Sequence, residues 1–330
     1  MKRCFLFGIL LVFLLFMENA YAEPENDLNW VRNDYVGVGA IDMQKLTDRN
    51  IYADLMAFFV TDPDAKQVLG ELEKAGLNSK SLQRIVVGIP ADVEKGEFII
   101  FWELKDTLDK YLPVLENRET QLNKASYQNR DYFCVKNKNQ CLLVAGNNLV
   151  YASELKLKGV LDVYAGKADV EINDALVQTA KRADVSKDAW LAFSLDEVQR
   201  SRIGAADPLV DQSAKGKGQL KLGAVKSGTL SIDFSQGLRS EMVIHMVSQE
   251  AARDFSGIVN DLMRQGLNDQ DIKSMELENL IKGLSLQAKA DNLMITVNYS
   301  QNTFQKLISI VTDVVKSAAH DKPIEPKKLK

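Results

Sequence analysis

The sequence predicts an α+β fold: two tandem copies of a β-α-β-β-α-β-β-α unit that form a mainly antiparallel sheet with helices on one face. Three observations lead to this prediction. Short runs rich in branched and aromatic residues are separated by hairpin-length gaps, longer stretches carry apolar residues at helical spacing, and residues 189–196 repeat the pattern of residues 35–42. Strands with short connections pair antiparallel, and amphipathic helices bury their apolar stripe against such a sheet.

The first unit is predicted over residues 35–170. Its strands are recognised by branched and aromatic residues between turn-like segments, and its helices by apolar spacing. In chain order, the predicted elements are a strand at 35–41, a helix at 43–74, strands at 83–89 and 97–103, a helix from Thr107, a hairpin of 132–135 with 140–144, and a strand and helix within 148–164.

The second unit is predicted over residues 189–320. In chain order, its elements are strands at 189–196, 226–234 and 239–247, a helix at 249–264, strands at 282–288 and 292–298, and a helix at 303–317. A constant shift of 144 residues aligns the apolar residues of both units, including residues 148–150 with 292–294. The stripe of Ala251, Phe255, Ile258, Val259 and Leu262 predicts a helix face buried on the sheet.

The remaining segments are predicted to connect or flank the two units. Residues 23–34 form an N-terminal segment, 171–188 a helical connector, and 321–330 a disordered basic tail with two prolines and four lysines. Asp42 and Asp196 occupy matching positions in the two units, each at the end of a strand and the start of a helix. A carboxylate at that junction is typical of a helix N-cap, although a pair of carboxylates could also do acid and base work.

The first 22 residues predict export. Lys2 and Arg3 precede an apolar run that ends near Met17, and Ala20-Tyr21-Ala22 gives a small-residue cleavage site. This is the pattern of a secretory signal peptide cleaved after Ala22, and the run falls short of the roughly 18 residues of a spanning helix. We therefore expect a periplasmic or secreted protein with no transmembrane segment in the mature chain.

The charge of the chain excludes one large class of partner. The full sequence has 41 basic and 45 acidic residues and a net charge of −4. A mildly acidic chain lacks the basic surface that binds nucleic acid, so no nucleic-acid partner is expected.

Cys134 and Cys141 are the only cysteines after the predicted cleavage site. The predicted hairpin places them opposite each other, and an oxidising compartment favours a disulfide between such neighbours. Free thiols and metal or redox work are the alternatives. Two thiols without a nearby histidine supply at most half of a zinc site, and the spacing is not that of a C-x-x-C motif.

Few residues suggest catalysis. The sequence contains no nucleophile-elbow, zinc-protease, phosphate-loop or dinucleotide motif, and we expect no cofactor and no metal. His245 lies between Met242 and Met246, a combination that suggests copper, but strand alternation turns the two methionines away from the histidine. Among the aromatic residues, Trp30, Trp102 and Trp190 could contribute to a binding surface, although packing in the core is the more common role.

Several stretches resemble uncharacterised exported α+β repeat proteins of Gram-negative bacteria. These are the strand endings "ID" and "LD", the "AGL" before a short strand, and "NNLVYAS" before a helix. The resemblance covers most of the chain after residue 22 and implies the compartment and the fold, but it supplies no catalytic residue.

Together these observations favour a non-enzymatic exported binding protein of the bacterial envelope. It would use a sheet face or the cleft between the two units to engage another envelope protein, because a duplicated scaffold without a polar constellation suits binding better than chemistry. Two alternatives stay open: a carrier of an apolar ligand such as a lipid or acyl chain, and a hydrolase that uses a carboxylate pair.

Overall fold

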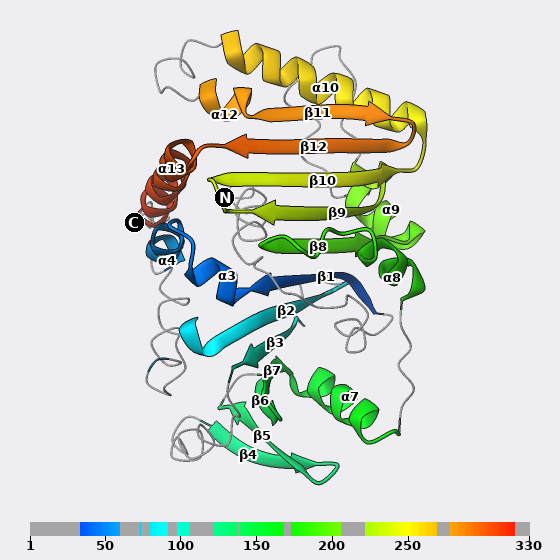
Figure 1. Ribbon diagram of the computed structural model, residues 1–330. Helices are drawn as coiled ribbons and strands as arrows, with labels where there is room; N and C mark the ends of the chain where they lie inside the picture. The colour runs from blue at the N-terminus through cyan, green and yellow to red at the C-terminus, as the bar shows by residue number, and fades with distance from the viewer. Residues whose placement is uncertain are drawn as a thin grey trace, which may run out of the picture.

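A computed structural model of the chain describes residues 34–59, 73, 79–91, 98–105, 122–136, 139–167, 173–205, 222–268 and 278–320. The predicted signal peptide, Trp30, the helix expected from Thr107 and the tail lie outside these residues. Within them the structure contains a twelve-stranded sheet and eight α-helices (Figure 1). The α+β class predicted from the sequence is confirmed.

All the described strands belong to one continuous sheet, and every pairing in it is antiparallel. The order across the sheet is β11-β12-β10-β9-β8-β1-β2-β3-β7-β6-β5-β4. The strands are β1 (Tyr35–Asp42), β2 (Leu82–Pro90), β3 (Ile99–Leu104), β4 (Leu122–Tyr127), β5 (Arg130–Val135), β6 (Gln140–Ala145), β7 (Asn148–Ser153), β8 (Ala189–Ser194), β9 (Val225–Asp233), β10 (Leu238–Met246), β11 (Leu284–Lys289) and β12 (Asn292–Tyr299).

The N-terminal and C-terminal halves of the sheet meet at the pair β1 and β8, which are aligned over five residue pairs centred on Gly39 and Leu191. The strands on either side of this pair follow in a corresponding order: β2, β3, β7 and β6 on one side, and β9, β10, β12 and β11 on the other. The hairpin of β4 and β5 then extends the N-terminal side by two more strands.

The helices differ from the prediction in both directions: those at residues 249–268 and 301–320 are longer than predicted, whereas the first predicted helix is divided. The helix expected at 43–74 is represented by two short helices, α3 and α4, on either side of residues 48–51, with residues 60–72 and 74–78 outside the description. The helices are α3 (Met43–Thr47), α4 (Tyr52–Phe59), α7 (Glu154–Tyr164), α8 (Asp174–Ala180), α9 (Glu197–Ala205), α10 (Gln249–Asn268), α12 (Glu278–Lys282) and α13 (Gln301–His320).

The expectation that helices lie on one face of the sheet is wrong, because strand β8 contributes to two cores. Trp190 and Ala192 pack with residues of α7 and α8, whereas Ala189 and Leu191 pack with residues of α3, α4 and α13. Successive strand residues point to opposite faces, so the two groups of helices cover opposite sides. We call these the α7 face and the α13 face.

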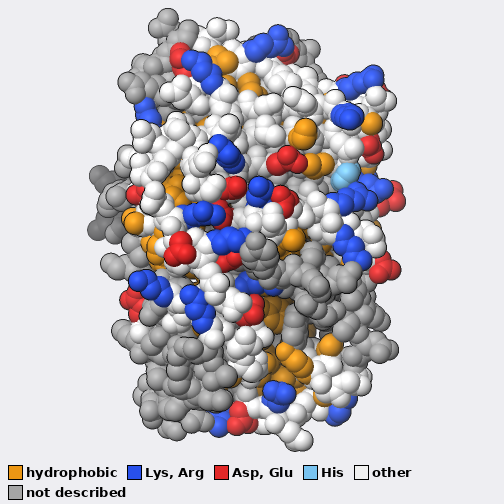
Figure 2. All heavy atoms as spheres, in the orientation of Figure 1, with side chains coloured by type: hydrophobic (Ala, Val, Ile, Leu, Met, Phe, Trp, Pro, Cys, Tyr) orange, Lys and Arg blue, Asp and Glu red, His pale blue; other side chains and the backbone are white. Residues whose placement is uncertain are grey.

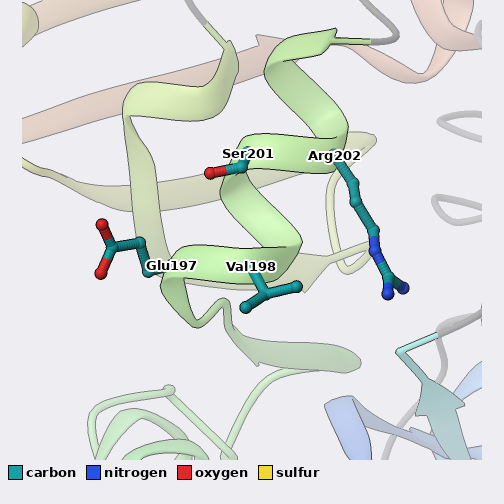
Figure 3. Close-up of a pocket in the computed structure, with 4 residues that line it drawn as sticks. All are labelled: Glu197, Val198, Ser201 and Arg202. Atoms are coloured by element: carbon teal, nitrogen blue, oxygen red, sulfur yellow. The ribbon is translucent and has the colours of Figure 1, made fainter.

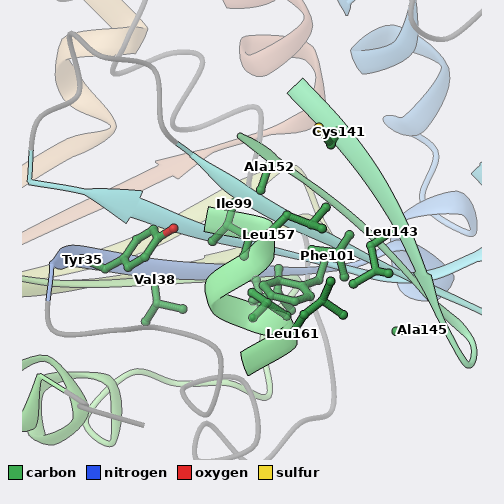
Figure 4. Close-up of a cluster of buried hydrophobic side chains, with 14 of the residues drawn as sticks. Tyr35, Val38, Ile99, Phe101, Cys141, Leu143, Ala145, Ala152, Leu157 and Leu161 are labelled. Carbon is green, nitrogen blue, oxygen red and sulfur yellow. The ribbon is translucent and has the colours of Figure 1, made fainter. Parts of the chain in front are cut away.

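The core on the α7 face is centred under helix α7 (Figure 4). Leu157, Val160 and Leu161 of α7 contact a floor of strand residues that includes Leu143 and Val150, all of them buried. Each such side chain contributes about 1.5–3 kcal/mol by burial. This core belongs to the N-terminal half of the sheet.

The core on the α13 face extends from the centre of the sheet to its C-terminal end. Phe304 of α13 and Leu55 of α4 lie over the central strands, and Ala252 of α10 lies over the last strands. The stripe predicted to be buried on α10 is only partly so: Ala251, Phe255 and Val259 pack against the core, but Leu262 is 40% exposed.

Candidate binding surface

On the α7 face, helix α8 covers β8 and β9, but no described helix covers β10, β12 and β11. The described helices that contact β10, β11 and β12 are α10, α12 and α13, and they pack on the α13 face through residues such as Met246, Leu286 and Tyr299. The alternate residues of the same strands point the other way. In Figures 1 and 2 this half of the sheet faces the reader, with charged and apolar side chains interspersed on it.

We call this surface the open face. Its members are the residues of β10, β12 and β11 that point away from α13, related by the strand registers: Arg239, Glu241, Val243, His245, Asn292, Met294, Thr296, Asn298, Ser285, Gln287 and Lys289. Met294 lies directly opposite Val243 and is 38% exposed. Glu241 lies opposite Thr296.

The open face differs in polarity from the equivalent surface under α7. The hairpins β6–β7 and β11–β12 share one register, because Gln140 pairs with Ser153 and Leu284 pairs with Val297, a shift of 144 at both positions (284 − 140 and 297 − 153). At this shift, the buried Leu143 corresponds to the exposed Gln287.

The other positions under α7 change in the same direction. Cys141 corresponds to Ser285 and Ala152 to Thr296, while Val150 corresponds to Met294. A floor built for a covering helix would be apolar throughout, because buried hydroxyl and amide groups need partners. The residues of the open face are therefore suited to contact with water or with a polar partner.

Charges on and beside the open face are only partly neutralised. Nη1 of Arg182, which follows α8, lies 3.1 Å from Nε2 of His245, and Arg239 donates to Oε1 of Gln236 at 2.8 Å. Within the described residues no cation forms an ion pair with Glu241, which is exposed. The face thus presents the acid Glu241, the basic side chains Arg239, His245 and Lys289, and the large apolar side chain of Met294.

Next to this face, Asp233 at the end of β9 is held ionised. Burial opposes ionisation, but hydrogen bonds from Ser235 and the nearby Lys187 ammonium outweigh it and hold the pKa of Asp233 below its usual range.

The two described tryptophans have different surroundings. Trp190 is fully buried in the core on the α7 face, so its side chain is part of no exposed surface, and its indole N–H has no hydrogen-bond acceptor among the residues that the structure describes. Trp102 is half-buried on the α13 face, with its ring centroid 6.0 Å from that of Tyr151. The structure brings neither of them to the open face.

Asp42 and Asp196 both accept a hydrogen bond from a backbone amide three residues later, at 2.8 Å in each case. Asp42 is the N-cap of α3, and Asp196 immediately precedes α9. The side-chain oxygen of Gln199 in α9 accepts in turn from the backbone N–H of Asp196 at 2.8 Å, which completes a capping box. Both carboxylates satisfy helix ends, and neither is paired with another acid by these contacts.

The disulfide predicted from the hairpin is confirmed. Cys134 and Cys141 are bonded, occupy opposite positions in β5 and β6, and have Cα atoms 3.9 Å apart. Glu154 lies close enough to both sulfur atoms to complete a set of three ligand atoms, but disulfide sulfurs are not thiolates and do not bind metal as such. The carboxylate of Glu154 instead accepts from Tyr132 and pairs with Lys158.

A hollow of about 420 Å³ lies on the surface beside α9 and is lined by Glu197, Val198, Ser201 and Arg202 (Figure 3). Positions one and four residues apart place these side chains on one exposed side of the helix. A carrier of acyl chains needs an interior cavity with aliphatic walls, which this open and charged hollow does not provide.

Within the described residues, no helix combines the length and the apolar character needed to cross a bilayer.

Comparison with known proteins gives a likeness of fold. No protein-family model matches the chain, and no curated protein matches it. Crystal structures of TP0453, a Treponema pallidum protein, resemble it. Crystal form I is 8% identical with a TM-score of 0.47 and covers 89% of this chain and 98% of that chain; the values for form IV are 9%, 0.47, 86% and 96%. A likeness of this degree concerns the course of the chain alone.

Proposed function

We propose that this is a non-enzymatic binding protein, exported to the bacterial envelope, which engages another envelope protein through the open face. The observation that carries the proposal is the polarity of that face: the positions that α7 buries in the N-terminal half are Ser285, Gln287 and Thr296 in the C-terminal half, beside the exposed Met294. An apolar centre within a polar and charged rim is the composition of a protein–protein contact.

The sheet face is a better candidate than a cleft between the two units. The halves are joined by backbone pairing of β1 with β8, so they form one sheet without a break at the junction. A flat face of three adjacent strands also offers a rigid surface, which reduces the entropy lost on binding.

We further infer that the two halves derive from a duplicated unit, and that the second copy has been adapted for binding. The shared 144-residue register of β6–β7 and β11–β12 and the matching strand order around β1 and β8 support this inference. In this interpretation the two copies differ at the surface that binds the partner. Helix α7 covers that surface in the first copy, whereas α13 lies on the opposite side of the sheet and leaves it open in the second.

Site-specific photo-crosslinking in the source organism tests the proposed surface. A crosslinking residue at position 294 is expected to link one envelope protein, whereas the same residue at Arg253, exposed on α10, is expected not to link it. The partner identified in this way is then purified for titration.

Charge reversal on the open face should weaken binding to that partner. Glu241→Lys is expected to raise the dissociation constant at least about tenfold, since like-charge contacts in an interface cost several kcal/mol. Asp254→Lys makes the same change on α10 and should leave the affinity unchanged. Equal affinities for wild type, Glu241→Lys and Asp254→Lys would contradict the proposal.

Export is tested independently by intact mass. We expect a chain that begins at Glu23 and is lighter by two hydrogens because of the disulfide. Recovery of a chain that retains residues 1–22 would contradict cleavage.

A further inference from the structure

One end of the open face carries a row of basic and amide side chains. Lys289 on β11 pairs with Asn292 on β12, and Asn292 pairs with His245 on β10. Residues opposite each other in neighbouring strands have Cβ atoms about 4.5–5.5 Å apart and project from the same face. Arg182, which follows α8, reaches this row, because its Nη1 lies 3.1 Å from Nε2 of His245. We call Lys289, Asn292, His245 and Arg182 the basic row.

The contact between Arg182 and His245 determines the state of the imidazole. A guanidinium carries only N–H donors, so Nε2 of His245 must accept through its lone pair. The ring in this contact is therefore neutral, with its proton on Nδ1. A protonated ring would direct an N–H at the guanidinium and place two positive charges side by side. An anion bound between the two side chains would remove this conflict, because it accepts from both of them.

The acids near the basic row do not neutralise it. Within the described residues, no ion pair involves a member of the row. The acids that flank the row along the chain are Asp184 and Asp291. Asp184 lies 3.9 Å from the ammonium of Lys187, whereas Asp291 takes part in none of these ion pairs. The two permanent cations of the row therefore outnumber its one unpaired acid, and protonation of the imidazole would add a further positive charge.

The rest of the open face favours a protein as the source of the anion. Glu241 is exposed and lies four residues from His245 on β10, about 13 Å along the strand. Met294, opposite Val243, lies between them. A uniformly anionic surface, such as a membrane of acidic lipids, would be repelled by Glu241. A protein can place an acid over the basic row, a base over Glu241 and an apolar group against Met294, and such complementary charges fix the orientation of a partner.

We propose that the basic row binds an aspartate or glutamate side chain of the partner protein, and that His245 takes up a proton from the solvent when this carboxylate binds. The inference rests on the proposed function and names the chemistry of the partner at the same face. A carboxylate accepts strong, charge-assisted hydrogen bonds from a guanidinium and from an imidazolium. Because the bound state holds one proton more than the free state, the affinity rises as the pH falls through the range of about 5 to 8 in which histidine changes its charge.

Titration of the full, oxidised chain with an acidic peptide tests the site without the partner. The probe is an amidated hexaglutamate peptide, and hexaglutamine is its uncharged control. Replacing the second histidine by His320→Gln leaves His245 as the only source of imidazole NMR signals. Hexaglutamate should shift these signals, with a dissociation constant about tenfold lower at about pH 5.5 than at about pH 8, and hexaglutamine should not. Unchanged signals, or equal dissociation constants at both pH values, would overturn the proposal.

Three variants locate the effect, with the signals of the peptide itself as the readout. His245→Gln should still bind hexaglutamate weakly but lose the specific rise in affinity at low pH. Arg182→Gln should weaken binding about tenfold at both pH values. Arg253→Gln removes an exposed charge from α10, on the other side of the sheet, and should change neither property. A pH dependence that persists in full in His245→Gln would refute the role of the imidazole.

The result can be separated from that of the proposed function. Photo-crosslinking at position 294 requires the partner, whereas the peptide titration requires only this chain. A crosslinked partner together with a silent titration would refute the acidic site and leave the proposed function in place. A response to the peptide without any crosslinked partner would support the site and contradict the proposed function alone. Binding to phosphatidylglycerol vesicles that depends on Arg182 and His245, without a response to the peptide, would overturn the proposal in favour of a lipid surface.

Discussion

At the scale of single residues, the ion pair of Arg49 and Asp188 joins segments that are distant in the sequence. Asp188 is 1% exposed and accepts from Nη2 of Arg49 at 2.7 Å and from the backbone N–H of Phe234. The hydrogen bond that Arg49 donates to Asp188 holds the pKa of Arg49 above its ordinary value. The pair connects the loop after α3 to the start of β8.

Removal of the arginine should therefore be costly. Arg49→Met leaves a buried carboxylate without its cation and should lower the free energy of unfolding by about 3 kcal/mol. Asp188→Asn in the same chain should recover part of the loss, because it removes the uncompensated charge. Urea unfolding of the wild type and these two variants measures these values, and a loss below about 0.5 kcal/mol in Arg49→Met would show that the pair is not structural.

Tyr299 provides a prediction on pH. Its hydroxyl donates to the carbonyl of Leu280 at 2.7 Å, and burial raises the pKa of Tyr299 to about 12. Because the folded pKa exceeds the unfolded pKa of about 10, the folded state keeps a proton that the unfolded state releases. The contribution to stability is complete below pH 10 and is lost as the pH rises through about 12.

Tyr299→Phe should remove this dependence on pH. The variant should lose about 1 kcal/mol at neutral pH through the missing hydrogen bond, and the difference from wild type should shrink as the pH rises from 10 to 12. Unfolding by urea at several alkaline pH values measures it. A difference that stays constant over that range would contradict the assignment.

At the scale of elements, the disulfide between β5 and β6 is expected to stabilise only the hairpin that it joins. The bond closes a loop of eight residues between Cys134 and Cys141, counting both ends, which corresponds to about 2.5 kcal/mol of chain entropy. The double variant Cys134→Ser with Cys141→Ser should therefore fold with a lower stability by about that amount. Loss of the entire fold, seen by circular dichroism, would show that the bond does more than fasten one hairpin.

The elements also show where sequence patterns succeed. The strands of the cysteine hairpin were predicted because Tyr132, Phe133 and Leu143 are aromatic or branched, and all three are buried. Strand β4 was missed because Leu122–Tyr127 is mostly polar and its turn contains no glycine. An edge strand with one neighbour buries too little to require an apolar pattern.

At the scale of the whole molecule, the pairing of β1 with β8 joins the two halves into one cooperative structural unit. Leu191 of β8 and Ile41 of β1 belong to the same core, which also includes Phe304 of the last helix. Neither half can lose its strands without exposing the core of the other. We therefore expect the halves to unfold together.

A single transition is the corresponding prediction. Tryptophan fluorescence of a Trp102→Phe variant follows the junction of the two halves through Trp190 on β8, and that of Trp190→Phe follows the N-terminal half through Trp102, with Trp30 replaced in both. The two unfolding curves, each compared with the circular dichroism of the same variant, should coincide within each protein. Separate transitions would indicate two independent domains.

The sequence by itself determined the α+β class, the antiparallel pairing and the cysteine pair, because these depend on patterns within a strand, a helix or one hairpin. Only the tertiary structure decided on which side of the sheet each helix lies. The apolar stripes of α7 and α13 would suit either face, and the choice depends on contacts between segments far apart in the chain. That choice leaves Glu241, Gln287 and Met294 uncovered, so the candidate surface emerges from packing and not from any local motif.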